Sequence, residues 1–302
     1  MKTLVTGGGG FIGGHLVEQL LNDGHDVISM DIFPNGIPNN SFTKKHKNLK
    51  FVKDDVANGQ SIFSHFTGID WVFHLACLGG QMPSIERPTD YYRTNVSGTL
   101  WVLEACKKAN VKRIIYCAST TCYGEPDKLP TPENSEIKLE YPLSVTKYLG
   151  EVLALSWNTI YQVPVNSVRF TTVYGNQSSF SKSFGSVLTP FLNKKLSNEP
   201  YTVVGDGSQT RDFTFVSDAV DACIAVVKSN VIGEAFNVGS GDHKSINDLI
   251  SFLGGGDIIY LPDNPGEAKH TLHDITKIKT SIGWEPKISL QDGVKLILNS
   301  IK

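Results

Sequence analysis

A glycine-rich turn between a short apolar strand and an amphipathic helix constrains the fold of this chain most. The turn, TGGGGFIG, covers residues 6–13, between an apolar run at 3–5 and a helical pattern over 15–21. In that setting glycines let the backbone approach a pyrophosphate, and the helix N-terminus offers it unpaired N–H groups. The turn therefore predicts a dinucleotide site. The residues expected to bind there are Gly7, Gly10, Phe11, Ile12 and Gly13.

A carboxylate after the next strand indicates which dinucleotide the site takes. The apolar run 27–30 ends in Asp31, followed by Ile32. This is roughly the 20-residue separation from the glycines that the dinucleotide fingerprint has. A carboxylate at that position accepts hydrogen bonds from ribose hydroxyls and repels a 2′-phosphate. We therefore expect the cofactor to be NAD rather than NADP, with Asp31 and Ile32 among its contacts.

Short apolar strands alternate with helical patterns through the first half of the chain. The alternation predicts an α/β fold, a Rossmann-type doubly wound parallel sheet. The expected strands are 3–5, 27–30, 49–52, 71–74, 113–117, 165–169 and 235–238, and the expected helices are 15–21, 90–109, 144–161, 245–252 and 290–300.

The pattern changes beyond Gly175, where polar and glycine-rich segments take over. We expect an NAD-binding Rossmann domain over residues 1–165 and a smaller substrate-binding lobe over 166–302. Segments near 166–175 and 233–240 are expected to return to the Rossmann sheet.

Composition excludes several classes of protein. The formal net charge is −2 and charged residues make up 19%, so neither nucleic acid nor an anionic membrane is expected as a partner. Five cysteines, an odd number without metal-type spacing, predict free thiols in a reducing compartment and no bound metal. No apolar run approaches the ~20 residues of a membrane span, and the N-terminus leads directly into a strand. We therefore expect a cytoplasmic protein.

Further motifs follow the glycine turn in a fixed order through nearly the whole chain. They are the segments 55–56, 73–76, 95–96, 98–99, 118–119, 123–124, 211–213, 236–239 and 283–286. In this order and spacing the chain resembles the extended short-chain dehydrogenase/reductases, in particular the NAD-dependent nucleotide-sugar epimerase/dehydratase family, and within it UDP-glucose 4-epimerase-like members.

The resemblance implies further cofactor contacts. Asp55 and Val56 would contact the adenine, and Asn95 would support the central strands. The segment Leu75, Ala76 and Cys77 would line the cofactor cleft. The remaining implied contacts are Cys117, Lys147, Phe170 and Val173.

The resemblance also assigns catalytic roles. Ser119 falls at the hydroxyl position that hydrogen-bonds the sugar hydroxyl being oxidised, and Lys147 at the lysine that holds the nicotinamide ribose. The family's dehydratases carry an Asp-Glu pair directly after that serine, and its decarboxylases carry a glutamate. Here Thr120 and Thr121 stand there, and they cannot act as bases near neutral pH. Dehydration and decarboxylation are therefore disfavoured, and Thr121 resembles the threonine of 4-epimerases.

Implied substrate contacts are spread over the chain. Arg211 resembles an arginine that binds the nucleotide diphosphate, where a cation contributes most. Thr172 stands where relatives often have asparagine, and Asn264 where many have a second arginine on the diphosphate. Ser84, Thr120 and Glu267 complete the expected substrate contacts.

One departure from the family pattern concerns the proton carrier. The family has a tyrosine four residues before the lysine, and here that position is Leu143, which exchanges no proton. Tyr141 could reach the site if the entry of the helix is remodelled. A different group could serve instead, or the site could only bind. The alternative groups are Tyr123, Tyr148, Cys117, Cys122 and a group of the substrate itself.

These residues lead to one favoured function and two alternatives. We expect NAD-dependent redox chemistry at C4 of a nucleotide-diphosphate sugar, with 4-epimerisation favoured. The alternatives are a C4 dehydrogenase or ketoreductase, and a catalytically silent NAD and nucleotide-sugar binding protein. By the same resemblance we expect a homodimer that pairs the helices 90–109 and 144–161.

Overall fold

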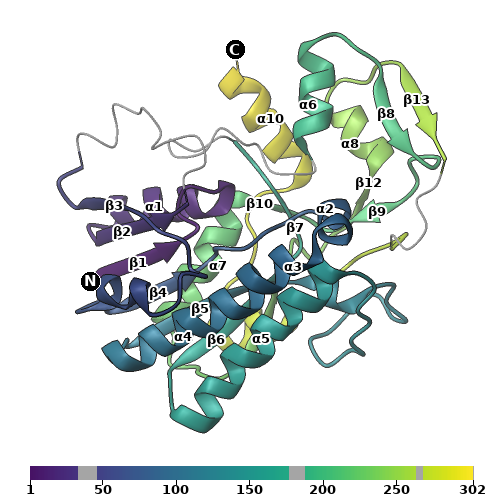
Figure 1. The fold of residues 1–302 in the computed structure, drawn as a ribbon. Helices are drawn as coiled ribbons and strands as arrows, with labels where there is room; N and C mark the ends of the chain where they lie inside the picture. Colours follow the sequence, from purple (N-terminus) through teal and green to yellow (C-terminus); the bar gives the residue numbers. More distant parts are fainter. Residues whose placement is uncertain (33–45, 177–187, 263–267, 302) are drawn as a thin grey trace.

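The computed structural model describes residues 1–32, 46–176, 188–262 and 268–301. Its centre is a seven-stranded sheet with all neighbouring strands parallel, in the order β11-β6-β5-β4-β1-β2-β3 (Figure 1). The doubly wound α/β prediction is confirmed, and each of the seven predicted strands is present. Their bounds are β1 Lys2–Thr6, β2 Asp26–Asp31, β3 Leu49–Lys53, β4 Trp71–His74, β5 Arg113–Ser119, β6 Val165–Phe170 and β11 Ala235–Val238.

Both faces of the sheet are buried under helices, and successive strand residues point to opposite faces. Val5, Phe73 and Ile115 belong to one apolar cluster. Their neighbours Leu4 and Val72 belong to the other. Helices α1 (Phe11–Asn22) and α7 (Val216–Lys228) cover the first face, and α4 (Gly98–Ala109) and α5 (Pro142–Tyr161) cover the second (Figure 1).

Short helical segments precede or connect these elements. They are η1 (Gly59–Phe66), α2 (Gln81–Glu86), α3 (Pro88–Tyr91), the π-helical segment η2 (Tyr92–Ser97) and η3 (Thr120–Tyr123). The predicted helix 90–109 is therefore a π-helical segment followed by a regular helix, and the predicted helix 144–161 lies within α5.

Helix α7 is a large element that sequence reasoning missed. Nine of its thirteen residues are buried. Its apolar and polar residues alternate at least as clearly as those of α1, α4 and α5, which were predicted, so the helical signal was present in the sequence.

The remaining elements gather largely away from the sheet (Figure 1). Strands β8 and β13 pair in parallel, β9 pairs with β12 in antiparallel, and β7 pairs with β10. The assignment of 1–165 and 166–302 to separate domains stays a prediction. The bounds are β7 Thr172–Tyr174, α6 Leu188–Leu196, β8 Tyr201–Val204, β9 Thr210–Arg211, β10 Phe213–Phe215, β12 Lys244–Ser245, α8 Ile246–Phe252, β13 Ile258–Leu261, α9 Thr276–Ile282 and α10 Leu290–Ile301.

The strand order places a crevice at the end of two neighbouring strands. The chain runs from β1 outward through β2 and β3, then returns to β4 on the other side of β1. Open parallel sheets bind their ligands at such a switch point, outside the carboxyl ends of the strands. The glycine turn after β1 and the segment after β4 meet there.

Replacing Gly13 with alanine tests the close packing at this point. A Cβ on Gly13 would overlap the Gly7 carbonyl oxygen and approach the Gly8 Cα to 3.0 Å. Because both are backbone atoms, we expect Gly13→Ala to destabilise the protein by about 1–3 kcal/mol in urea unfolding. Gly79→Ala is the matched control, since its Cβ would meet nothing within 4 Å. Equal stability of the two variants would contradict this packing.

Candidate active site

A cleft of about 460 Å³ lies at the switch point. The structure brings together there the glycine turn, the ends of β4, β5 and β6, and the first turns of α5. Ser119 and Lys147 line it, and so does Leu143. The predicted cofactor contacts that also line it are Gly7, Gly10, Phe11, Ile12, Gly13, Leu75, Cys77, Cys117, Phe170 and Val173.

The backbone of the glycine turn fits a dinucleotide. Gly7 has a φ of +72°, and a Cβ there would come within 2.7 Å of the Ala76 backbone nitrogen. Gly10 is the N-cap of α1, and among the described residues no side chain caps that helix. The N–H groups of its first turn are therefore available to a phosphate.

Asp31 ties the same turn to β2. Its Oδ2 accepts a hydrogen bond from the Gly9 N–H at 2.9 Å. The Gly7 N–H donates to the Met30 carbonyl at 2.8 Å. The carboxylate is therefore next to the glycine backbone, where the ribose of a bound dinucleotide would lie. Ile32 follows it and is exposed.

Ser119 ends β5 with its hydroxyl oriented by Thr121. Both the backbone N–H and the hydroxyl of Thr121 donate to Ser119 Oγ, at 3.2 and 3.1 Å. With its oxygen accepting twice, Ser119 can give its own proton to an acceptor in the cleft. Thr120 instead donates its hydroxyl to the Phe170 carbonyl at 3.2 Å.

Lys147 lies on α5, and its side chain reaches the cleft from a buried position. It is 7% exposed, donates to the Cys117 carbonyl and lies 4.9 Å from the centroid of the Tyr116 ring. Burial alone would lower the pKa of Lys147, but the nearby Cys77, Tyr116 and Cys117 side chains outweigh it and raise the pKa overall. Lys147 is therefore a cation at neutral pH.

Leu143 and Tyr141 are placed differently. Leu143 lies one helical turn before Lys147 and lines the same cleft, as the spacing of the family's tyrosine and lysine predicts. Tyr141 is the N-cap of α5, with extended backbone. Among the described residues that line this cleft, Leu143 is present and Tyr141 is not.

The other candidate proton carriers are disfavoured by burial or by their position outside the cleft. Burial raises the pKa of Tyr123, whose hydroxyl donates to Asn237 Oδ1 at 2.8 Å. It also raises the pKa of Cys122 to about 12 and that of Cys117 well above its ordinary value. Tyr148 follows Lys147 on α5, outside the set that lines the cleft.

A chain of buried hydrogen bonds lies beneath the cleft, centred on His74. His74 Nδ1 is 2.7 Å from Thr6 Oγ1, and Nε2 is 3.0 Å from Thr99 Oγ1. Burial lowers the pKa of His74 to about 3, assisted by the charge of Lys147, so the ring is neutral. Because the Thr99 hydroxyl donates to the Asn95 carbonyl, Nε2 must carry the ring proton and Nδ1 must accept from Thr6. Sequence analysis assigned His74 no role.

Two buried side chains fix the segment after β4. The side chain of Asn95 accepts from the Leu78 N–H at 2.8 Å and donates to the Leu78 carbonyl at 3.1 Å. The hydroxyl of Tyr91 donates to the Gly80 carbonyl at 3.0 Å and to that of Gly79. Asn95 thus supports this wall of the cleft from inside the protein.

A buried ion pair, which sequence reasoning missed, attaches α5 to the sheet. Arg169 of β6 donates through Nε to Glu151 Oε2 at 2.9 Å, with a second contact from Nη2. Ser167 donates to the same carboxylate at 2.8 Å. Arg169, as a charged residue within the predicted strand 165–169, was the available signal. The pair fixes the helix that carries Leu143 and Lys147.

The other predicted contacts lie away from the cleft lining. Asp55 follows β3 and pairs with Arg93 at 2.8 Å, while Val56 is buried. The Ala76 N–H donates to Thr6 Oγ1 at 3.2 Å. Ser84 is fully buried and donates its hydroxyl to the Gln81 carbonyl at 2.6 Å. Their ligand contacts stay predictions.

Arg211 lies in a separate hollow of about 400 Å³, with Lys269 and His270 beside it. Its Nη1 donates to the Lys269 carbonyl at 3.2 Å. Thr172 is half-buried in β7. Asn264 and Glu267 lie outside the described residues. The expected diphosphate and sugar contacts of these four residues stay predictions.

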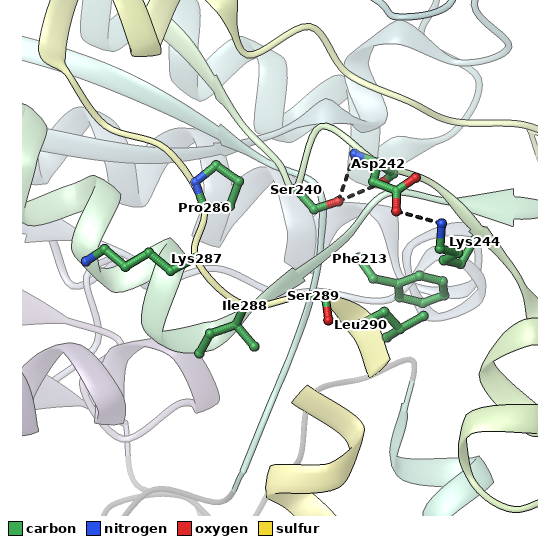
Figure 2. A pocket seen from close by; sticks show the side chains of 9 residues that line it. All are labelled: Phe213, Ser240, Asp242, Lys244, Pro286, Lys287, Ile288, Ser289 and Leu290. Carbon is green, nitrogen blue, oxygen red and sulfur yellow. Dashed lines mark hydrogen bonds and ion pairs between the residues drawn. The ribbon is translucent and has the colours of Figure 1, made fainter. Parts of the chain in front are cut away.

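A third hollow, of about 220 Å³, lies beside the loop that precedes α10 (Figure 2). Three of its polar residues contact one another: Asp242 pairs with Lys244 at 2.6 Å, and Ser240 Oγ donates to the Asp242 carbonyl at 2.7 Å. It is separate from Ser119 and Lys147.

Over the described residues, no three potential ligands cluster as a metal site would require, and no helix is long and apolar enough to cross a membrane.

A doubly wound sheet with this turn and cleft defines a dinucleotide-binding α/β protein of the Rossmann type. The profile of the NAD dependent epimerase/dehydratase family matches residues 3–239. The chain belongs to that family.

Individual relatives cover the whole chain. A UDP-glucuronic acid 4-epimerase from Bacillus cereus, solved with UDP-glucuronic acid and NAD, has a TM-score of 0.91 and 32% identity, over 100% of this chain and 99% of that one. A UDP-glucose 4-epimerase from Thermotoga maritima, solved with UDP-glucose, has a TM-score of 0.91 and 30% identity, over 100% and 98%. A UDP-N-acetyl-alpha-D-glucosaminuronate decarboxylase from Bacillus cytotoxicus is 30% identical over 97% of this chain and 95% of its own.

The neutral state of His74 predicts a pH dependence of stability. Its pKa is about 3 when folded and about 6.5 when unfolded. Between these values the unfolded state binds the extra proton, so stability is lost as the pH falls below 6.5. We expect this group to contribute about 1.4 kcal/mol per pH unit near pH 5. His74→Gln should reduce the slope of unfolding free energy against pH by that amount in urea titrations. If the unfolding free energy of the native protein and that of His74→Gln changed with pH at the same slope, His74 would protonate in the folded protein and the prediction would be wrong.

Proposed function

We propose that this protein is an NAD-dependent 4-epimerase of a nucleotide-diphosphate sugar, with uridine diphosphate sugars as the first candidates. The observation that carries the proposal is that Ser119 and Lys147 share one cleft with the glycine turn. The named activities of the Bacillus cereus and Thermotoga maritima relatives support it.

Each group that lines the cleft would have a separate role in the reaction. The turn around Gly10 and the start of α1 bind the pyrophosphate, and Asp31 holds the adenosine ribose. Bound NAD supplies a reversible hydride acceptor. Lys147 orients the nicotinamide ribose with a buried positive charge. Ser119, oriented by Thr121, holds the C4 oxygen of the sugar.

The residues after Ser119 favour epimerisation over the other reactions of the family. Elimination of water from the sugar needs an acid and a base beside C5 and C6, and both positions are threonines here. The hydroxyls of Thr120 and Thr121 are already donated, to Phe170 and Ser119. They orient the site and carry no titratable proton near neutral pH.

The function is tested by proton NMR on a panel of nucleotide-diphosphate sugars incubated with the protein and NAD. We expect the anomeric signal of a C4 epimer, with no net absorbance of NADH at 340 nm. A keto product with matching NADH would instead identify a C4 dehydrogenase. Ligand-induced stabilisation without any product would identify a binding protein.

Leu143→Tyr tests whether the cleft retains the geometry of the family's chemistry. A phenol at this position would face Lys147 from one helical turn away. General acid–base groups contribute about 10²–10⁴ in rate, so we expect kcat to rise at least about tenfold. Leu143→Phe is the matched control, because it adds the ring without the hydroxyl. An equal effect of both variants on kcat would contradict a proton-transfer role for this position.

We also propose a cytoplasmic homodimer. Support for the dimer comes from α5, whose surface exposes Leu149, Val152, Ile160 and Tyr161, since exposed apolar side chains grouped on one element often mark an interface. Support for the compartment comes from the five cysteines, which are all free.

A further inference from the structure

Leu143 leaves the proposed reaction without a proton carrier on α5, and the segment after β4 supplies a candidate in the same cleft. Cys77 follows β4 and lines the same cleft as Leu143 and Lys147. All five cysteines are within the described residues, and Cys77 alone among them is exposed. Its thiol is therefore accessible to a ligand in the cleft.

The backbone on both sides of Cys77 is held from within the protein. The Ala76 N–H before it donates to Thr6 Oγ1, which belongs to the His74 chain. Both backbone groups of Leu78 after it are hydrogen-bonded by the buried Asn95. The backbone that carries Cys77 is therefore held in position, as the support of a reacting group must be.

The charge of Lys147 acts on this thiol. Lys147 keeps a raised pKa despite its burial, and Cys77 makes the largest contribution in that direction. In general, a positive charge beside a cysteine favours the thiolate over the thiol. A cysteine needs less assistance than a tyrosine, because its ordinary pKa is near 8.5 rather than 10.

We propose that Cys77 Sγ, paired with Lys147, is the proton carrier of the 4-epimerisation proposed above. The Cys77 thiolate takes the proton of the C4 hydroxyl as C4 is oxidised to a ketone, and the thiol returns that proton to the C4 oxygen as the ketone is reduced on its opposite face. NAD, held by the glycine turn, Asp31 and Lys147, would accept the hydride from C4 in the first step and return it to C4 in the second. The sugar is oxidised and then reduced, and no other reactant is consumed.

The pairing of thiol and ammonium can be measured without turnover. Iodoacetamide alkylates thiolates, and mass spectrometry of the full-length protein reports the rate at Cys77. At pH 7 we expect Lys147→Met to slow this rate about tenfold or more. Lys112→Met is the control, because Lys112 pairs with Asp70 on the surface. An unchanged rate in Lys147→Met would overturn the proposal.

Catalysis is tested by Cys77→Ala. We expect kcat to fall about 10²–10⁴-fold with KM nearly unchanged, whereas Cys106→Ala, which removes a buried thiol of α4, keeps its kcat. Adding Leu143→Tyr to Cys77→Ala should restore turnover. Full activity of Cys77→Ala would overturn this proposal and leave the epimerase function standing. Failure of both the native protein and Leu143→Tyr to form any epimer would overturn the proposed function itself.

Discussion

The structure of the site depends on an uncharged histidine buried between two strands. His74 ends β4 and connects Thr6, at the end of β1, with Thr99 of α4. Every proton in this chain of hydrogen bonds has one acceptor only if the His74 ring is neutral. Charging the buried ring would cost several kcal/mol. The switch point, the glycine turn and the segment that carries Cys77 are therefore held together by buried polar groups of the protein itself.

Much of the fold could be predicted because its strands are short apolar runs between recognisable helices. The prediction that one site contains Ser119, Leu143 and Lys147 agrees with the cleft. Parallel strands end at one edge of the sheet, and Lys147 lies one helical turn after Leu143. Helix α7 was missed although its residues follow the helical period as clearly as those of the predicted helices.

Long-range partners were harder to predict than elements. The pairing of Arg169 with Glu151 depends on how α5 packs on β6, and the burial of Ser84 depends on the packing of α2. Nothing in the local sequence specifies either. For the same reason the exposure of Cys77, compared with the burial of Cys117, emerges only once β4, β5 and α5 are assembled around the cleft.

The central claim is that a sugar is oxidised and reduced at C4 in one cleft without releasing an intermediate. The direct measurement uses a nucleotide-diphosphate sugar carrying deuterium at C4, incubated with the protein and NAD in ordinary water. The account predicts that the C4 epimer forms with the deuterium still at C4, since the same hydrogen returns to the opposite face. Loss of the label to water, or a product labelled elsewhere, would contradict it.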